Sequence, residues 1–243
     1  MRCLICHQPI NETITWSTLF TLSSWQNEPQ ICHPCNQKLE LITGEQCRSC
    51  SRPFSKLDNK FRKQDICNDC FLWERQSGWQ DLLTKNISIF YYNDFLRELL
   101  AQFKFRGDHE IVKIFTSYMQ NKFKQTFDQK NPPIILPVPL SAERLYERGF
   151  NQAYSLASLL NVPIEDILAR THSEKQSKKK KAERIVTDSP FLLKQDIQLD
   201  RYYNKSLLII DDIYTTGTTL RQIAKTLGSL SPKSINSLTL ARS

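Results

Sequence analysis

The stretch LLIIDDIYTTGTT, residues 207–219, decides how the larger part of this chain is expected to fold. Its first four residues are apolar without alternation, which is typical of a strand covered on both faces. Two aspartates follow, and then four threonines around Gly217. Backbone N–H groups at the start of a helix, a glycine and several hydroxyls form a cradle for a phosphate monoester. The stretch therefore predicts a strand, an anion-binding loop and a helix.

Strands and helices alternate along the rest of this part of the chain. Apolar runs predict strands at 87–92 and 134–140, and residues 234–241 are expected to form the closing strand. Periodic apolar residues predict helices within 94–108, 111–123, 150–160 and 220–230. Residues 122–133 look like a polar connection. In the helix at 150–160 the residues expected to face inward are Phe150, Ala153, Tyr154, Ala157 and Leu160. This order predicts an α/β fold, an open and mainly parallel sheet with helices on both faces.

Asp211 and Asp212 are expected at the carboxyl end of a central strand, where ligands bind in such sheets. Two carboxylates there suit the hydroxyls of a ribose and, directly or through water, a magnesium ion. A ribose 5-phosphate that carries a leaving diphosphate has all the matching groups. The alternative is an ordinary helix start with Thr215 or Thr216 as the N-cap, which leaves the two aspartates unexplained.

All eight cysteines lie in the first 70 residues, as four pairs with two residues between the members of each pair. Such pairs can present two thiolates to one tetrahedral zinc ion, and two pairs complete the shell. The first two pairs and the last two pairs are expected to form two closed structural zinc sites, from Cys3, Cys6, Cys32 and Cys35 and from Cys47, Cys50, Cys67 and Cys70. We expect a zinc-binding cysteine-knuckle domain over residues 1–86 and the α/β domain over 87–243.

Other arrangements of the cysteines remain open. Interleaving the pairs, first with third and second with fourth, is compatible with the spacing. Disulfides would need an oxidising compartment, and a redox role would need only one pair. His7 and His33 lie beside ligand cysteines, but four cysteines already fill each site.

The charge of the chain favours an anionic partner. The net charge is +8, and residues 1–86 hold 10 Lys/Arg against 9 Asp/Glu, so most of the excess lies in the larger part. A phosphorylated small molecule or nucleic acid would suit it, although lysines that only keep the protein soluble are an alternative. No apolar run is long enough to cross a bilayer and the start lacks a secretory signal, so we expect a cytoplasmic protein without membrane insertion.

The motifs resemble a known family. Residues 207–219 are similar to the signature of type I phosphoribosyltransferases, whose ligand is phosphoribosyl diphosphate (PRPP). LPVPLSAERLYERGFNQA, residues 136–153, and KFRGD, residues 104–108, together with the cysteine-rich start, resemble the ComF family of competence-associated phosphoribosyltransferase-like proteins. The resemblance covers nearly the whole chain. It implies a type I phosphoribosyltransferase-like domain that binds PRPP with Mg²⁺.

The resemblance also implies roles for individual residues. Asp211 and Asp212 would contact the ribose 2′- and 3′-hydroxyls. The 5′-phosphate would be bound by the loop of Thr215, Thr216, Gly217, Thr218 and Thr219. The loop after the strand at 134–140 takes the place of the diphosphate-binding loop, so Arg144 and Arg148 are candidates for that group, since a planar guanidinium suits phosphate oxygens. Alternatively these arginines pair with Glu143 and Glu147.

Two departures from the family pattern bear on catalysis. Thr215 stands where purine-using relatives have an aspartate that handles the proton of the base, and a threonine is no general base at neutral pH. We therefore name no catalytic residue. The segment 170–184 corresponds to the flap over PRPP, but only Gln176 and Arg184 keep its pattern. The segment contains the lysine run Lys178, Lys179, Lys180 and Lys181. Three interpretations of this run are open: a solvated loop, a loop that closes over diphosphate, or a loop that follows a nucleic-acid backbone.

Three functions are compatible with these residues. The first is a PRPP-binding accessory protein of natural competence that acts in the cytoplasm on or near incoming single-stranded DNA, together with proteins of the competence machinery. The second is a nucleobase or nucleotide salvage phosphoribosyltransferase. The third is a nucleic-acid-binding adaptor without catalysis.

Overall fold

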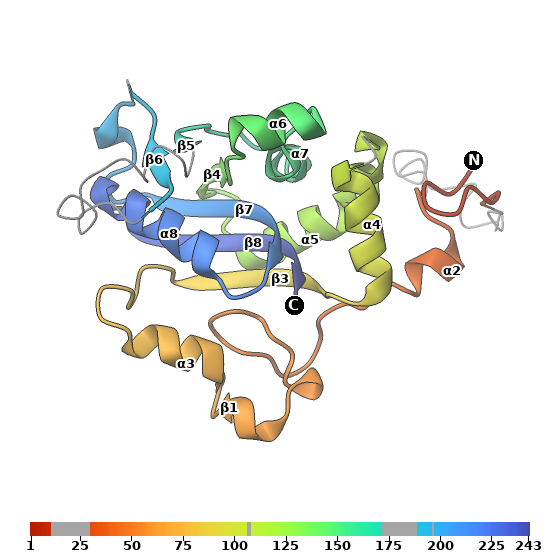
Figure 1. The fold of residues 1–243 in the computed structure, drawn as a ribbon, viewed down its shortest axis with the longest axis horizontal. Helices are drawn as coiled ribbons and strands as arrows, with labels where there is room; N and C mark the ends of the chain where they lie inside the picture. Colours follow the sequence, from red (N-terminus) through yellow and green to blue (C-terminus); the bar gives the residue numbers. More distant parts are fainter. Residues whose placement is uncertain (11–29, 106–107, 172–188, 196) are drawn as a thin grey trace.

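A four-stranded parallel sheet forms the centre of the computed structural model, which describes residues 1–10, 30–105, 108–171, 189–195 and 197–243 (Figure 1). The strand order is β3-β8-β7-β4, and all three pairings are parallel. The strands are β3 (Lys85–Tyr91), β4 (Ile134–Pro137), β7 (Ser206–Tyr214) and β8 (Ser234–Arg242). The predicted open parallel sheet is confirmed, and β7 is one of its two inner strands.

The unbroken apolar run in β7 reflects burial on both faces of the sheet. Leu208 and Ile210 belong to one hydrophobic core, and Leu207 and Ile209 to the other. The first core also holds residues of α4 (Asp94–Phe105), α5 (Thr116–Thr126) and α7 (Gln152–Ser158). The second holds α8 (Thr218–Leu227). Helices therefore cover both faces, as predicted.

Shorter elements complete the described chain. The remaining helices are α2 (His33–Asn36), α3 (Asn68–Arg75) and α6 (Ala142–Arg148), and the 3-10 segments are η2 (Phe54–Lys56), η3 (Asn59–Phe61), η4 (His109–Phe115), η6 (Leu199–Arg201) and η7 (Gly228–Leu230). Two small antiparallel pairs join β1 (Arg62–Lys63) to β2 (Ile66–Cys67) and β5 (Leu168–Arg170) to β6 (Phe191–Leu193). The β5–β6 pair was not predicted, because three residues are too few for a periodic signal.

Several predicted boundaries differ from the structure. The single helix expected at 111–123 is the 3-10 segment η4 followed by α5, and α5 continues to Thr126, so the connection before β4 is shorter than predicted. Tyr154 is 48% exposed, whereas Leu156 is buried. Ala153, Ala157 and Leu160 are buried as predicted, so the buried stripe of this segment includes Leu156 in place of Tyr154.

The cysteine-rich region lies in two places (Figure 1). Residues 1–10 and α2 lie beside α4, where Cys3, Cys32 and Cys35 form a small cluster with Phe95. The segment from Cys47 to Cys70 lies below the sheet and is part of the second core. Between them, the Ile42 N–H donates to the Ile89 carbonyl at 2.9 Å, which joins the connecting segment to β3. The boundary predicted near residue 86 falls inside β3.

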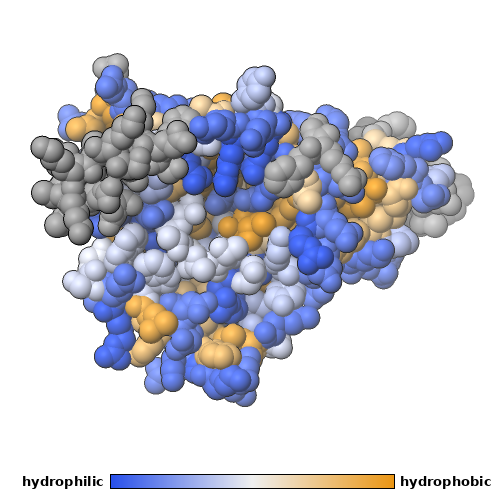
Figure 2. Space-filling model, in the orientation of Figure 1, coloured by the Kyte–Doolittle hydropathy of each residue, from blue (hydrophilic) through white to orange (hydrophobic). Residues whose placement is uncertain are grey.

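The surface is mainly polar on the face shown in Figure 2, where hydrophobic residues form separate small patches among hydrophilic ones. Among the described residues, no helix combines the length and apolar character needed to span a bilayer.

Candidate functional site

Asp211 and Asp212 lie in β7 beyond the end of the neighbouring strand. The last pair between β4 and β7 is Pro137 with Ile210, whereas β7 continues beside β8 with Asp211 opposite Thr239. The strand predicted at 207–210 is therefore too short: β7 extends to Tyr214 because β8 pairs with it that far. With no β4 residue beside them, the two aspartates are placed at the carboxyl end of the sheet.

The acidic pair lies in surroundings that disfavour two negative charges. Burial, and then the charge of Asp212, raise the pKa of Asp211 well above its usual value, and the charge of Lys104 opposes this rise. The Asp211 carboxylate also accepts a hydrogen bond from the Asp212 N–H at 2.9 Å. A cation near these carboxylates would relieve their repulsion.

Lys104, near the end of α4, supplies one such cation. Its ammonium forms an ion pair with the Asp212 carboxylate, and the two side chains are only 18% and 14% exposed. Lys104 was not among the predicted site residues. The signal was present, since Lys104 is the first residue of the KFRGD motif.

Arg144 and Arg148 lie on a helix, α6, and not on the loop that was predicted. Ser141 caps this helix by accepting from the Arg144 N–H at 3.4 Å, and Gly149 ends it with φ of 75°. Burial, and then the charge of Arg144, lower the pKa of Arg148, while Asp212 and Asp211 act in the opposite direction. The guanidinium of Arg148 donates to Gln152 at 2.8 Å. Both arginines therefore contribute positive charge next to the acidic pair.

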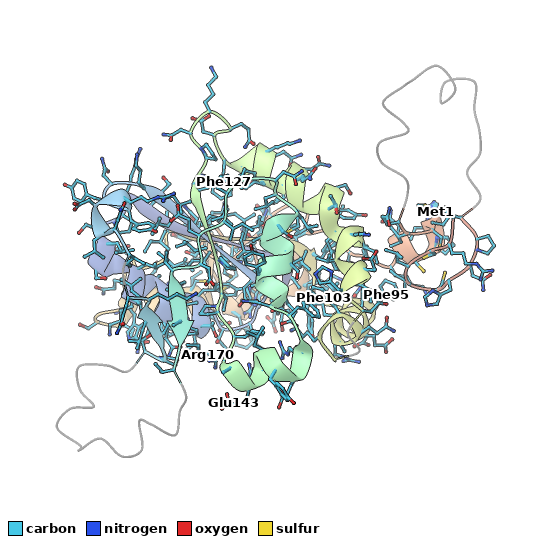
Figure 3. All side chains as sticks on the ribbon, turned by 90° about the horizontal axis from the view of Figure 1, so that it is seen from above. Met1, Phe95, Phe103, Phe127, Glu143 and Arg170 are labelled. Carbon is cyan, nitrogen blue, oxygen red and sulfur yellow. The ribbon has the colours of Figure 1, made fainter. Side chains whose placement is uncertain are left out.

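Arg170, in β5, is a further basic residue of the site that sequence reasoning missed. Burial, and then the charge of Arg144, lower its pKa, and the charge of Asp211 raises it. Figure 3 shows Arg170 and Glu143 of α6 at the same edge of the molecule. The only sequence signal for Arg170 was its place as the first residue of the segment 170–184.

The threonine-rich loop turns sharply between β7 and α8. Gly217 precedes the helix with φ of 82°, and Thr218 and Thr219 are its first two residues. A Cβ atom on Gly217 would overlap the Tyr214 ring, so both the backbone angle and the available space require glycine. The N-cap is Gly217 and not a threonine, although the Thr216 and Thr218 hydroxyls lie 2.9 Å apart. Such a turn can present successive N–H groups to an anion.

The cysteine sulfurs form two groups that follow the chain order and are not interleaved. Within each group the four Sγ atoms lie within 4.8 Å of one another. One Sγ–Sγ distance in each group is 3.6 Å, between Cys6 and Cys32 and between Cys50 and Cys67. Four sulfurs at about 2.3 Å from a tetrahedral ion would be roughly 3.8 Å apart. The first quartet (Cys3, Cys6, Cys32, Cys35) and the second quartet (Cys47, Cys50, Cys67, Cys70) therefore fit zinc.

Contacts among the sulfurs of the second quartet shift the pKa values of its thiols in opposite directions. Hydrogen bonding to Cys50 lowers the pKa of Cys47 to about 7, and hydrogen bonding to the other three sulfurs raises the pKa of Cys70. Metal ions bind the thiolate form, so zinc binding here would release protons.

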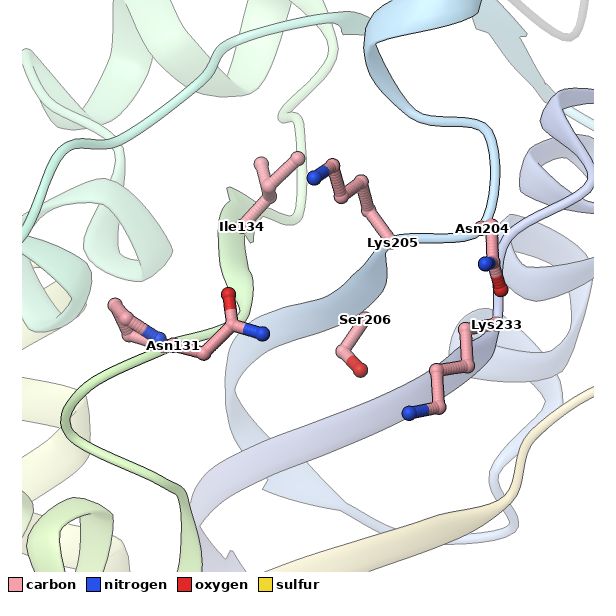
Figure 4. Close-up of a pocket in the computed structure, with 7 residues that line it drawn as sticks. Asn131, Ile134, Asn204, Lys205, Ser206 and Lys233 are labelled. Carbon is pink, nitrogen blue, oxygen red and sulfur yellow. The ribbon is translucent and has the colours of Figure 1, made fainter.

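A cavity of about 240 Å³ lies at the opposite end of the strands (Figure 4). Its lining is polar and basic, formed by Asn131, Pro132, Ile134, Asn204, Lys205, Ser206 and Lys233. These residues lie at or before the amino ends of β4, β7 and β8, so the cavity is separate from the acidic pair. The candidate nucleic-acid residues Lys178–Lys181 lie outside the described residues.

Comparisons with known proteins agree with this geometry. Residues 107–243 match the family model of the phosphoribosyl transferase domain. Competence protein ComFC from Bacillus subtilis (strain 168) is 38% identical over 242 residues, which cover 99% of this chain and 95% of that protein. Competence protein ComFC from Streptococcus pneumoniae is 29% identical over the full length of both. Competence protein F from Haemophilus influenzae is 24% identical over 231 residues, which cover 87% of this chain and 96% of that protein.

Proposed function

The chain belongs to the ComF family of competence proteins, with the phosphoribosyl transferase domain in its C-terminal part, and we propose that it binds PRPP with Mg²⁺ in natural competence. One observation supports this proposal above the others. Two adjacent carboxylates lie at the carboxyl end of a parallel sheet, between a helix-start loop and basic residues from three other elements. A sugar that carries phosphate at one end and diphosphate at the other matches these groups.

In this proposal each group of the site binds one part of the ligand. Asp211 and Asp212 bind the ribose hydroxyls and, directly or through water, Mg²⁺. The loop of Thr215, Thr216, Gly217, Thr218 and Thr219 takes the 5′-phosphate at the start of α8. Arg144 and Arg148, joined by Arg170, bind the diphosphate, because arginine forms paired hydrogen bonds with phosphate oxygens.

Lys104 has a separate role in the free protein. Its ion pair with Asp212 offsets part of the negative charge of the acidic pair. With Mg²⁺ bound beside Asp212, the Lys104 ammonium would be free to donate to a diphosphate oxygen. The ion pair thus compensates the charge of Asp212 in the free protein, and the ligand and Mg²⁺ can replace it.

We further propose that the protein acts in the cytoplasm on or near incoming single-stranded DNA. The basic excess of the chain and the run Lys178–Lys181 support electrostatic contact with phosphates. Between Arg144 and Arg148, α6 carries Tyr146, which is 91% exposed. An exposed aromatic ring next to basic residues suits base stacking on a single strand.

Both cysteine quartets are proposed to hold structural zinc ions. Each offers four sulfurs and no oxygen or nitrogen ligand, so neither has an open position for a reacting water. Elemental analysis of the purified chain is expected to give about two zinc ions per molecule. A value of one or zero would contradict the assignment.

Isothermal titration tests the PRPP site. We expect PRPP to bind only with Mg²⁺ present, and we expect binding to be lost in the double variant Asp211→Ala/Asp212→Ala. The control is Asp166→Ala, which removes an exposed carboxylate paired with Lys194. Unchanged PRPP affinity in the double variant would remove the acidic pair from the site.

The salt dependence of DNA binding tests the proposed contact with single-stranded DNA. Replacing Lys178–Lys181 with alanine is expected to weaken binding of a single-stranded oligonucleotide. The slope of log K against log salt should also become less steep, by up to about 0.7 for each phosphate that the lysines no longer neutralise. An unchanged slope would exclude these lysines from the DNA interface.

A further inference from the structure

Two side chains from other elements donate hydrogen bonds to backbone carbonyls of the loop that is proposed to bind the 5′-phosphate. Arg242, the last residue of β8, donates from Nη1 to the carbonyls of Tyr214 at 3.2 Å and Thr215 at 2.8 Å. Trp73 of α3 donates from its indole N–H to the carbonyl of Thr216 at 2.9 Å. Three successive carbonyls, from 214 to 216, are therefore fixed by donors from outside the loop.

Both donor residues are connected to the second quartet, Arg242 by a side-chain contact and Trp73 through the helix that carries Cys70. The Nε of Arg242 lies 3.3 Å from the Sγ of Cys50, and the Arg242 side chain is fully buried. Trp73 is three residues after Cys70 on the same short helix. The indole ring also packs under the guanidinium of Arg221 in α8, 5.1 Å from the ring centroid. The position of the quartet thus determines where both donors lie.

The knuckle of the second quartet is itself anchored to the sheet. The Asn86 N–H donates to the Ser49 carbonyl at 2.8 Å, and the Ser51 hydroxyl donates to the Asn86 carbonyl at 2.9 Å. The Asn86 side chain donates to the Cys50 carbonyl at 3.3 Å. The second quartet is therefore held at β3 on one side and contacts Arg242 on the other.

Peptide geometry links these contacts to anion binding. In a trans peptide the C=O of one residue and the N–H of the next point in opposite directions. Fixing the carbonyls of residues 214, 215 and 216 toward the quartet therefore directs the N–H groups of Thr215, Thr216 and Gly217 to the other side of the loop. Fixed N–H groups bind an anion better than mobile ones, because their ordering does not have to occur on binding.

We propose that the second quartet, through Trp73 and Arg242, positions the phosphate loop, so that zinc in this quartet and PRPP bind cooperatively. The inference rests on the proposed binding of PRPP. Trp73 and Arg242 are positioning residues, since they contact the loop carbonyls and act on the ligand only through the loop. The first quartet, which includes Cys35 of α2, packs against Phe95 of α4 and is not expected to take part.

The first test is Trp73→Phe, which keeps an aromatic ring against Arg221 and removes the indole donor. We expect PRPP affinity by titration to fall by roughly three- to tenfold, as for the loss of one hydrogen bond, with about two zinc ions retained. The matched control is Trp79→Phe, because the Trp79 ring packs at a tilt against Trp73, with 5.3 Å between centroids, and lies under the Lys225 ammonium of α8. The control is expected to bind PRPP as the wild type does.

The second test uses the unaltered protein and measures zinc. In an equilibrium competition with a chelator, saturating PRPP is expected to raise the apparent zinc affinity of the second quartet by at least about fivefold. By reciprocity, saturating zinc raises PRPP affinity by the same factor. The zinc in the first quartet, identified by its loss in Cys6→Ser, should be unaffected.

The outcomes separate this inference from the proposed function. If the wild type binds PRPP but Trp73→Phe binds it equally and PRPP leaves zinc affinity unchanged, the coupling is refuted while the site stands. If the wild type does not bind PRPP, the proposed function fails and the coupling fails with it. A drop in affinity that is as large in Trp79→Phe as in Trp73→Phe would also refute the role of the indole donor.

Discussion

Asp211 is a charged side chain in a position that disfavours its charge. Replacing it with asparagine keeps the acceptor for the Asp212 N–H and removes the cost of a half-buried carboxylate next to another one. We therefore expect Asp211→Asn to lose PRPP binding but to melt roughly 2 to 4 °C higher at pH 7, which corresponds to about 1 kcal/mol for a chain of this size. Differential scanning fluorimetry of the ligand-free protein measures the shift.

The pH dependence of that shift has a defined sign. The pKa of Asp211 is raised in the folded protein, so the wild type loses stability as pH rises from its unfolded pKa, near 4, through the raised folded value. The gap between Asp211→Asn and the wild type is thus expected to be largest at neutral pH and to close toward pH 4. A gap that grows in acid would contradict the raised pKa.

Lys104 is expected to stabilise the free protein through Asp212. Lys104→Met leaves a largely buried carboxylate without this counter-ion, which should cost about 1 to 3 kcal/mol in the absence of metal. Because Mg²⁺ would supply the missing charge, adding Mg²⁺ should raise the melting temperature of Lys104→Met more than that of the wild type. Arg97→Met, which removes an exposed partner of Asp94 on the same helix, is the control. Equal responses to Mg²⁺ would place the metal away from Asp212.

The residues of the candidate site differ in how far the sequence alone could predict them. Asp211, Asp212 and the threonine-rich loop are adjacent in sequence, so a local pattern was enough to predict them. Lys104 and Arg170 lie 107 and 41 positions from Asp211 and reach the site only through the packing of α4 and β5. No single-sequence pattern specifies such contacts, because they depend on how elements pack.

The turn between β7 and α8 depends on one glycine. Gly217→Ala would place a methyl group in the left-handed region and against the Tyr214 ring, so we expect a loss of about 1 to 3 kcal/mol in stability and of PRPP binding. Gly228→Ala is the matched control, since Gly228 has φ of −56° and open space at the Cβ position. That variant should be neutral or slightly more stable. Chemical denaturation measures both; equal stability of the two variants would contradict the tight packing of the turn.

Element types were predicted more reliably than element ends. All four strands of the sheet were predicted, although β3 and β8 are not apolar throughout and include the buried polar residues Ser88, Ser237 and Thr239. The end of β7 was missed, because Asp211, Asp212 and Ile213 are held in the strand by pairing with β8, which is a tertiary contact. For α6, the family resemblance implies a loop, although the serine and the glycine that cap this helix are present in the sequence.

The two quartets should differ in what they contribute to the folded protein. The sulfurs of the second quartet are part of the core that also contains β7 and α8, whereas the first quartet has a small cluster of its own. Cys67→Ser is expected to unfold much of the chain or lower its melting temperature by more than about 10 °C, a loss of several kcal/mol. Cys6→Ser should lose one zinc ion with a shift of only a few degrees. Similar shifts in the two variants would contradict this division.

The arrangement of the parts was only partly predictable. Alternation of strands and helices gave the parallel sheet, and cysteine spacing gave two groups of four. The contact between the second quartet and the threonine-rich loop is made through Arg242 and Trp73, each far in sequence from what it contacts. Neither residue belongs to a motif, so only the structure revealed the contact.

A crystal structure with PRPP and Mg²⁺ tests the central claim most directly. We expect the ribose hydroxyls and the metal ion at Asp211 and Asp212, with the 5′-phosphate at the N–H groups of residues 215–219. The claim would be contradicted if these carboxylates had no ligand and PRPP lay elsewhere, for example beside Lys205 and Lys233 in the cavity at the amino ends of the strands.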